Sequence, residues 1–142
     1  MRHDFLRIRP RLRATFYAVF AVLFASGAGW WAVHAAANDE KEIVTAETWL
    51  LKVHGAGAMA ALVVLGVLYP LHVLRGWKAN RNRGWGAALV AACVALTVSG
   101  YLLYYSGGET IRAAATATHV WLGLALPILL VVHIRRGRAT RM

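Results

Sequence analysis

The sequence predicts an all-α integral membrane protein, a four-helix transmembrane bundle with both termini on the cytoplasmic side. Hydrophobic residues make up 59% of the 142 residues, against roughly 45–50% in soluble domains. The 16 Lys and Arg and the 6 Asp and Glu all lie outside four uncharged runs, residues 14–38, 53–74, 84–108 and 113–134. The basic residues are also concentrated in the segments expected on one side. This pattern excludes a soluble globular protein and a disordered chain.

Each uncharged run is long enough for one membrane-spanning helix. The runs hold 25, 22, 25 and 22 residues, and a helix needs about 20 apolar residues to cross the hydrocarbon core. Barrel strands would alternate in polarity, and these runs do not. We expect a single membrane domain over residues 1–142. Its spans are expected at about 14–37, 49–74, 84–106 and 113–134.

The segments between the runs are short, which makes consecutive helices antiparallel neighbours. We expect an outer connection of about a dozen residues after the first span. Ser106, Gly107 and Gly108 predict the end of the third span. Pro70 and Pro127 lie inside the second and fourth spans, where each removes a backbone hydrogen bond and can kink its helix.

The charges predict the orientation. Segments 1–13, 75–83 and 135–142 carry 13 basic residues and one acidic residue, whereas the opposite loops carry three basic and five acidic residues. Short loops rich in Lys and Arg stay in the cytoplasm. The net charge of +10 is therefore a topology signal, and we expect no nucleic-acid partner.

Four of the six histidines form a pattern. An ionisable side chain inside a membrane span indicates function by default. At 100° per residue, His54 and His72 point in the same direction, and His119 and His133 agree to within about 40°. Because the second and fourth spans both run inward, His54 and His119 are expected in the outer leaflet, and His72 and His133 in the inner leaflet.

Two neutral imidazoles that face each other suit axial ligation of a haem iron. Two such pairs predict two haems and a path for electrons across the membrane. Zinc would need further ligands nearby. A proton relay or a transporter would usually bring Asp or Glu into the spans, and the four runs contain neither. The alternative is a haem-free structural or assembly subunit whose histidines only contact neighbouring helices.

The outer pair leaves one alternative open. At about 1.5 Å per residue, His54 and His72 are about 27 Å apart, but His119 and His133 only about 21 Å. Helix tilt or a kink could absorb the difference. Otherwise His34 replaces His54 opposite His119. We favour His54 because it shares a helix face with His72.

Arginines near the ligands could pair with haem propionates at the membrane surface. Arg75 follows His72 by three residues, and Arg112 precedes His119 by seven, close to two helical turns. Both are also ordinary residues for the end of a membrane helix.

The chain resembles four-helix di-haem membrane cytochromes b, namely the bacterial cytochrome b-561 proteins and the gamma subunits of formate dehydrogenases and hydrogenases. The most specific piece is His119 with Gly123 after it and His133 14 residues further on. The pairs His54–Gly55 and Ser99–Gly100 have the same character. In the gamma subunits one ligand comes from the first span, which here offers only His34.

The resemblance implies an electron-transfer subunit of an oxidoreductase with two b-type haems, in the inner membrane of a bacterium. Its implied partners are the membrane lipid, the quinone pool and a redox protein, either another subunit or a periplasmic carrier. Bis-histidine ligation leaves no open iron position for a substrate, so we expect the chain itself to be non-catalytic.

Overall fold

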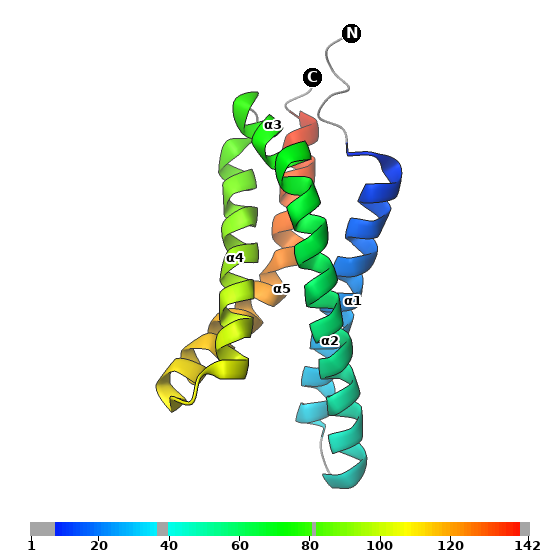
Figure 1. Ribbon diagram of the computed structural model, residues 1–142, viewed down its shortest axis with the longest axis vertical. Helices are drawn as coiled ribbons and strands as arrows, with labels where there is room; N and C mark the ends of the chain where they lie inside the picture. Colours follow the sequence, from blue (N-terminus) through cyan, green and yellow to red (C-terminus); the bar gives the residue numbers. More distant parts are fainter. Residues whose placement is uncertain (1–7, 37–39, 81, 140–142) are drawn as a thin grey trace. The chain divides into compact units, whose positions relative to one another are not determined.

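The structure, a computed structural model, describes residues 8–36, 40–80 and 82–139. Nearly all of these residues are helical (Figure 1). In chain order the elements are α1 (Pro10–Ala35), α2 (Glu40–Leu68), the π-helical turn η1 (Tyr69–Val73), α3 (Leu74–Lys78), α4 (Arg83–Tyr105) and α5 (Glu109–Ala139).

Among the described residues, four helical segments are long and apolar enough to cross a membrane. They are Pro10–Ala35, Thr45–Lys78, Arg83–Tyr105 and Glu109–Ala139. The second segment joins α2, η1 and α3 without a break. The predicted all-α architecture with four potential spans is therefore confirmed.

The helices extend beyond the uncharged runs. A long outer connection after the first span was expected, and this is wrong: α1 is capped by Ala36 and α2 already begins at Glu40. Charged residues end an apolar run but do not end a helix, and carboxylates are favourable at a helix N-terminus. At the connection after the third span the prediction is confirmed, because α4 ends at Tyr105 and Ser106 is its C-cap.

The turn between α3 and α4 is built from asparagines in the left-handed region. Asn80 and Asn82 have φ angles of 53° and 50°, which asparagine adopts more readily than most residues. The Arg83 guanidinium closes the turn, because Nε and Nη2 donate to the carbonyl of Trp77 at 2.9 and 2.6 Å. The chain therefore reverses within a few residues.

The two prolines inside helices act differently. Pro70 lies in η1, where the wider π turn tolerates a residue without an N–H. By contrast, α5 continues through Pro127. Residues beyond a π turn are rotated from the α-helical register, so the angle of 100° per residue does not hold between His54 and His72.

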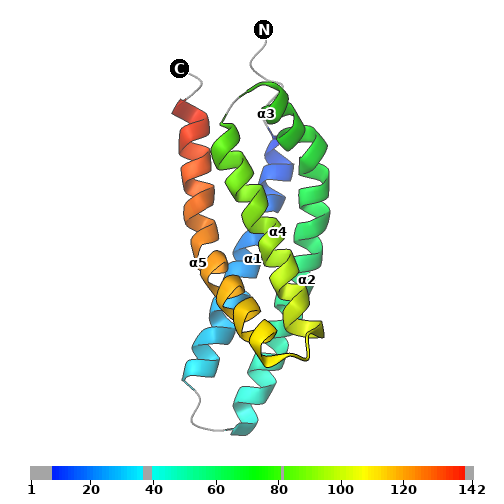
Figure 2. The ribbon, with the colours of Figure 1, turned by 90° about the vertical axis from the view of Figure 1, so that its left-hand side faces the viewer.

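The helices form two compact units, divided between His72 and Val73. In the first unit α1 packs along α2, and in the second α4 packs along α5 (Figures 1 and 2). Small side chains such as Ala61, Ala92 and Ala115 are buried, whereas Val63 and Trp121 are 69% and 71% exposed. Small residues at helix contacts with large apolar residues outside are typical of helices that pack in lipid.

Candidate functional site

His54 lies on α2, and its imidazole is held by α1. Nδ1 lies 3.0 Å from the carbonyl oxygen of Leu23 and 3.1 Å from Oγ of Ser26. A carbonyl only accepts hydrogen bonds, so Nδ1 carries the proton and donates it. The Ser26 hydroxyl donates to the carbonyl of Val22 at 2.7 Å and can accept from the same imidazole N–H. Nε2 of His54 therefore carries the lone pair.

The residue after Ser26 makes room for this imidazole. A Cβ atom built on Gly27 would lie 3.1 Å from Cε1 of His54, closer than carbon atoms normally approach. Ser26 itself is only 4% exposed. The dipeptide Ser26–Gly27 on α1 thus supplies both a hydrogen-bond acceptor and space for His54.

The second unit repeats this arrangement at His119. Nδ1 of His119, on α5, lies 3.0 Å from Oγ of Ser99 on α4. The Ser99 hydroxyl also lies 3.2 Å from the carbonyl oxygen of Leu96, and when it donates to that carbonyl it can accept from the imidazole. A Cβ atom on Gly100 would lie 3.3 Å from Cε1 of His119. In both units a buried serine and the glycine after it, on one helix, contact a histidine of the next long helix.

Sequence reasoning did not identify Ser26 and Gly27 as site residues. The dipeptide Ser-Gly occurs three times in the chain, and the third occurrence, Ser106–Gly107, follows the end of α4. The signal available in the sequence was that the same dipeptide occurs on two helices, each of which precedes a long helix with a predicted histidine ligand. Its meaning depends on which sides of the two helices meet, and the spacing along one helix does not determine this.

The two remaining predicted ligands differ from this pattern. His72 lies within η1, and π turns in helices are frequent at functional sites. The amide nitrogen of Asn82 donates to the carbonyl of His133 at 3.0 Å and lies 3.3 Å from its Nδ1. The His133 carbonyl can only accept, so it fixes the amide orientation, and the same amide nitrogen faces Nδ1 as a donor.

His34, the alternative ligand, has a different environment. Its Nδ1 lies 2.8 Å from Oε1 of Glu47 on α2, and its side chain is 62% exposed. Its ring stacks on Trp30 with centroids 4.9 Å apart and planes 10° apart. His34 is eight residues beyond Ser26, or about 12 Å along α1. It is therefore far from the part of α1 that holds His54.

The two predicted propionate partners, Arg75 and Arg112, are exposed. Arg75 lies in the short helix α3, and Arg112 lies in the first turns of α5. Both positions suit a charged group at the end of a membrane helix. Their role toward a haem stays a prediction.

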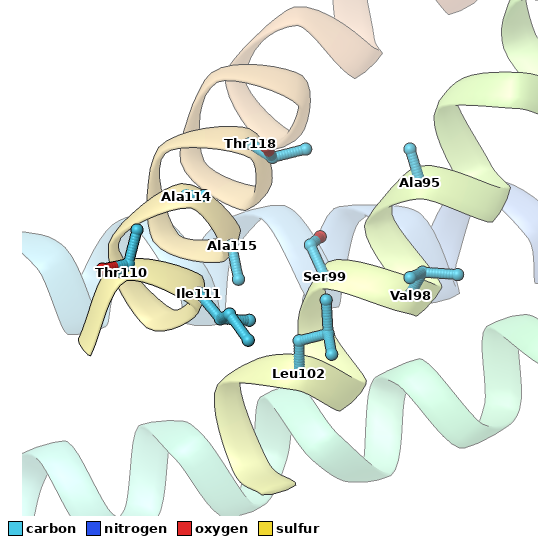
Figure 3. A pocket seen from close by; sticks show the side chains of 9 residues that line it. All are labelled: Ala95, Val98, Ser99, Leu102, Thr110, Ile111, Ala114, Ala115 and Thr118. Atoms are coloured by element: carbon cyan, nitrogen blue, oxygen red, sulfur yellow. The ribbon is translucent and has the colours of Figure 1, made fainter. Parts of the chain in front are cut away.

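An open pocket of about 390 Å³ lies between α4 and α5, beside the residue that holds His119. Ser99 and Leu102 of α4 face Ile111 and Ala115 of α5 across it (Figure 3). The lining residues are Ala95, Val98, Ser99, Leu102, Thr110, Ile111, Ala114, Ala115 and Thr118. Their polar groups are hydroxyls only, so the pocket suits an apolar occupant.

Within residues 8–36, 40–80 and 82–139, no three His, Cys, Asp or Glu side chains gather as a metal site. A bis-histidine haem takes only two ligands from the protein. Fold and composition together define a class of all-helical proteins with four helices able to span a membrane. Searches against protein families, curated proteins and solved structures find no match for this chain.

Proposed function

We propose that the chain is a b-type di-haem cytochrome subunit that carries electrons across a membrane. The observation that carries this proposal is the contact between Nδ1 of His54 and the carbonyl of Leu23. Histidines that bind metals typically donate their other ring N–H to a carbonyl or similar acceptor. This contact orients the ring and leaves the lone pair on Nε2, the nitrogen that would bind iron.

The matching contact in the second unit supports the outer pair. His119 contacts a buried serine as His54 does, and donation from its Nδ1 to that serine would give both ligands the same tautomer. The alternative ligand, His34, is bonded to a carboxylate at the exposed end of α1. We therefore assign the outer haem to His54 and His119.

The inner haem is assigned to His72 and His133. Two observations support this assignment. One is the number of residues between each of these histidines and the outer ligand on the same span, and the other is the π turn that contains His72. A π turn advances less per residue than an α-helix, so it reduces the excess length of about one turn between His54 and His72.

The bound haems would supply one-electron redox chemistry. The chain's own residues would hold the irons, exclude water and tune the potential. Hydrogen bonds from Nδ1 to Ser26, Leu23 and Ser99 make the imidazoles more basic and so favour the oxidised iron. We propose Arg75 and Arg112 as partners of the propionates.

The proposed setting is the inner membrane of a bacterium, with both termini in the cytoplasm and quinone as the lipid-soluble partner. A redox protein, either another subunit or a periplasmic carrier, would be the other partner. The competing function is a haem-free structural subunit, in which the same serine contacts would only fix helix packing.

Haem counting in matched variants tests the proposal. The purified chain is expected to hold about two haems, the number required by two bis-histidine sites. His54→Ala and His119→Ala should each hold about one, whereas His34→Ala should match the unchanged chain. Absence of haem from the unchanged chain, made in haem-supplied cells, would refute the cytochrome. Loss of haem in His34→Ala but not in His54→Ala would transfer the outer ligand to His34.

A further inference from the structure

Three side chains follow one another on α1 at intervals of four residues: Ser26, Trp30 and His34. Residues four apart are neighbours on one side of a helix. Ser26 holds His54, and Trp30 lies about 6 Å further toward the end of α1. The indole is therefore one helical turn from the level of the proposed iron ligand.

The indole N–H of Trp30 is a buried donor. Nε1 is inaccessible to solvent, and within the described residues no acceptor lies at hydrogen-bond distance. Buried polar groups in native proteins are nearly always hydrogen-bonded, because an unmade bond costs the desolvation of the group. An indole nitrogen can only donate. The missing partner is therefore an acceptor, such as a carboxylate oxygen.

The orientation of the indole is held from α2. The Trp30 ring stacks on His34, with centroids 4.9 Å apart and planes 10° apart. Glu47 on α2 fixes that imidazole through the 2.8 Å contact between Oε1 and Nδ1. His34 and Glu47 thus support the Trp30 ring, and an acceptor reaches Nε1 when the atoms that cover it in this structure move aside.

We propose that Trp30 donates its indole N–H to a propionate of the haem held by His54. This inference rests on the proposed function. A haem carries its two carboxylates on one edge of the macrocycle, beyond the iron. A donor one helical turn from the ligand is suitably placed to meet that edge. The bond would be charge-assisted, and it would come from a neutral group that can be buried without an ion pair.

The first test compares two tryptophan variants of the haem-loaded protein. Trp30→Phe keeps an aromatic ring and removes the N–H. Transfer of haem to a scavenging apoglobin should be about tenfold faster than from the unchanged chain, as expected for loss of one bond to a charged group. Trp31→Phe is the control, because Trp31 is the next residue and is 57% exposed. Its transfer rate should not change.

The second test replaces the cofactor. An iron porphyrin with ethyl groups in place of the propionates has the same iron and ring plane but no side-chain oxygen that could accept a hydrogen bond. With this porphyrin, Trp30→Phe and the unchanged chain should release the cofactor at equal rates. A tenfold difference that persists with it would mean that Trp30 only supports the fold and would overturn the inference. Equal rates with ordinary haem would overturn it as well.

A measurement on the unchanged chain does not depend on the stability of the variant. Hydrogen exchange at the ¹⁵N-labelled indole of Trp30 should be slower with haem than with the porphyrin that lacks propionates, and equal exchange would contradict the proposal. If the unchanged chain bound no haem, the proposed function itself would fail. Retained haem with an unaffected Trp30 would remove only this inference.

Discussion

The carbonyl oxygen of Leu23 accepts a hydrogen bond from Nδ1 of His54 at 3.0 Å. The bond joins the backbone of α1 to a side chain of α2, and it determines which imidazole nitrogen carries the proton. No substitution of the Leu23 side chain removes this acceptor. Ser26 and Gly27, which surround the same imidazole, are open to mutation.

Removal of the serine hydroxyls should raise the reduction potential of the outer haem. In Ser26→Ala and Ser99→Ala the imidazoles lose an acceptor for Nδ1–H and become weaker donors to oxidised iron. A bond worth about 1 kcal/mol corresponds to a rise on the order of tens of millivolts. Ser26→Ala should raise the potential less than Ser99→Ala, because the Leu23 carbonyl still accepts a hydrogen bond from Nδ1 of His54. Spectroelectrochemical titration measures both potentials.

Thr97→Ala is the matched control for the serines. Thr97 lies two residues before Ser99, and its hydroxyl donates to the carbonyl of Cys93 in its own helix. Its removal should leave the potentials unchanged. Equal potentials in Ser99→Ala and Thr97→Ala would mean that the Ser99 contact does not act on an iron ligand.

Methyl groups added beside the histidines should reduce haem binding. In Gly27→Ala and Gly100→Ala the new Cβ would lie 3.1 and 3.3 Å from the imidazoles of His54 and His119, so each ring must move away from its serine. We expect loss of about one haem per chain, measured as the haem-to-protein ratio. Gly66→Ala is the control, since a Cβ there meets nothing within 4 Å. It should keep its haem and gain up to about 1 kcal/mol of helix stability.

The inner pair has its own test. His72→Ala and His133→Ala should each lose one haem while the helix content, measured by circular dichroism, stays the same. The reason is that a bis-histidine haem needs both axial ligands, whereas the helices are stabilised by their own backbone bonds. Full haem content in both variants would refute the inner assignment.

The charge distribution predicts the sidedness of the turns. In a Cys93→Ala background, an added cysteine at Gly107 should react with a membrane-impermeant maleimide applied to intact cells. A cysteine at Ala79, in the turn between α3 and α4, should react only after the membrane is opened. The reverse labelling pattern would place both termini outside and contradict the orientation inferred from Lys and Arg.

The number and approximate positions of the helices could be predicted from the sequence because charge-free runs reflect membrane thickness directly. The ends of the helices could not be predicted from these runs. α2 begins at Glu40 and α5 at Glu109, and the Glu109 carboxylate in the first turn of α5 favours that helix. The π turn at Pro70 was also missed, because a proline is compatible with a kink, a break or a wider turn.

The candidate ligands could be proposed from residue type and spacing, since histidine is expensive inside a membrane and its positions repeat. The contacts that hold these histidines could not be predicted in this way. Ser26, Ser99 and Trp30 matter through the side of a neighbouring helix that they meet, and this depends on the rotation of one helix against another. Spacing along one chain segment contains no information about that rotation.

The most direct test of the central claim is a reduced-minus-oxidised visible spectrum of the purified chain, together with its haem-to-protein ratio. We expect sharp b-type bands and about two haems per chain, as required by two six-coordinate bis-histidine sites. A colourless protein from cells supplied with haem would contradict this expectation. The four histidines, and the two serines that contact His54 and His119, would then serve helix packing alone.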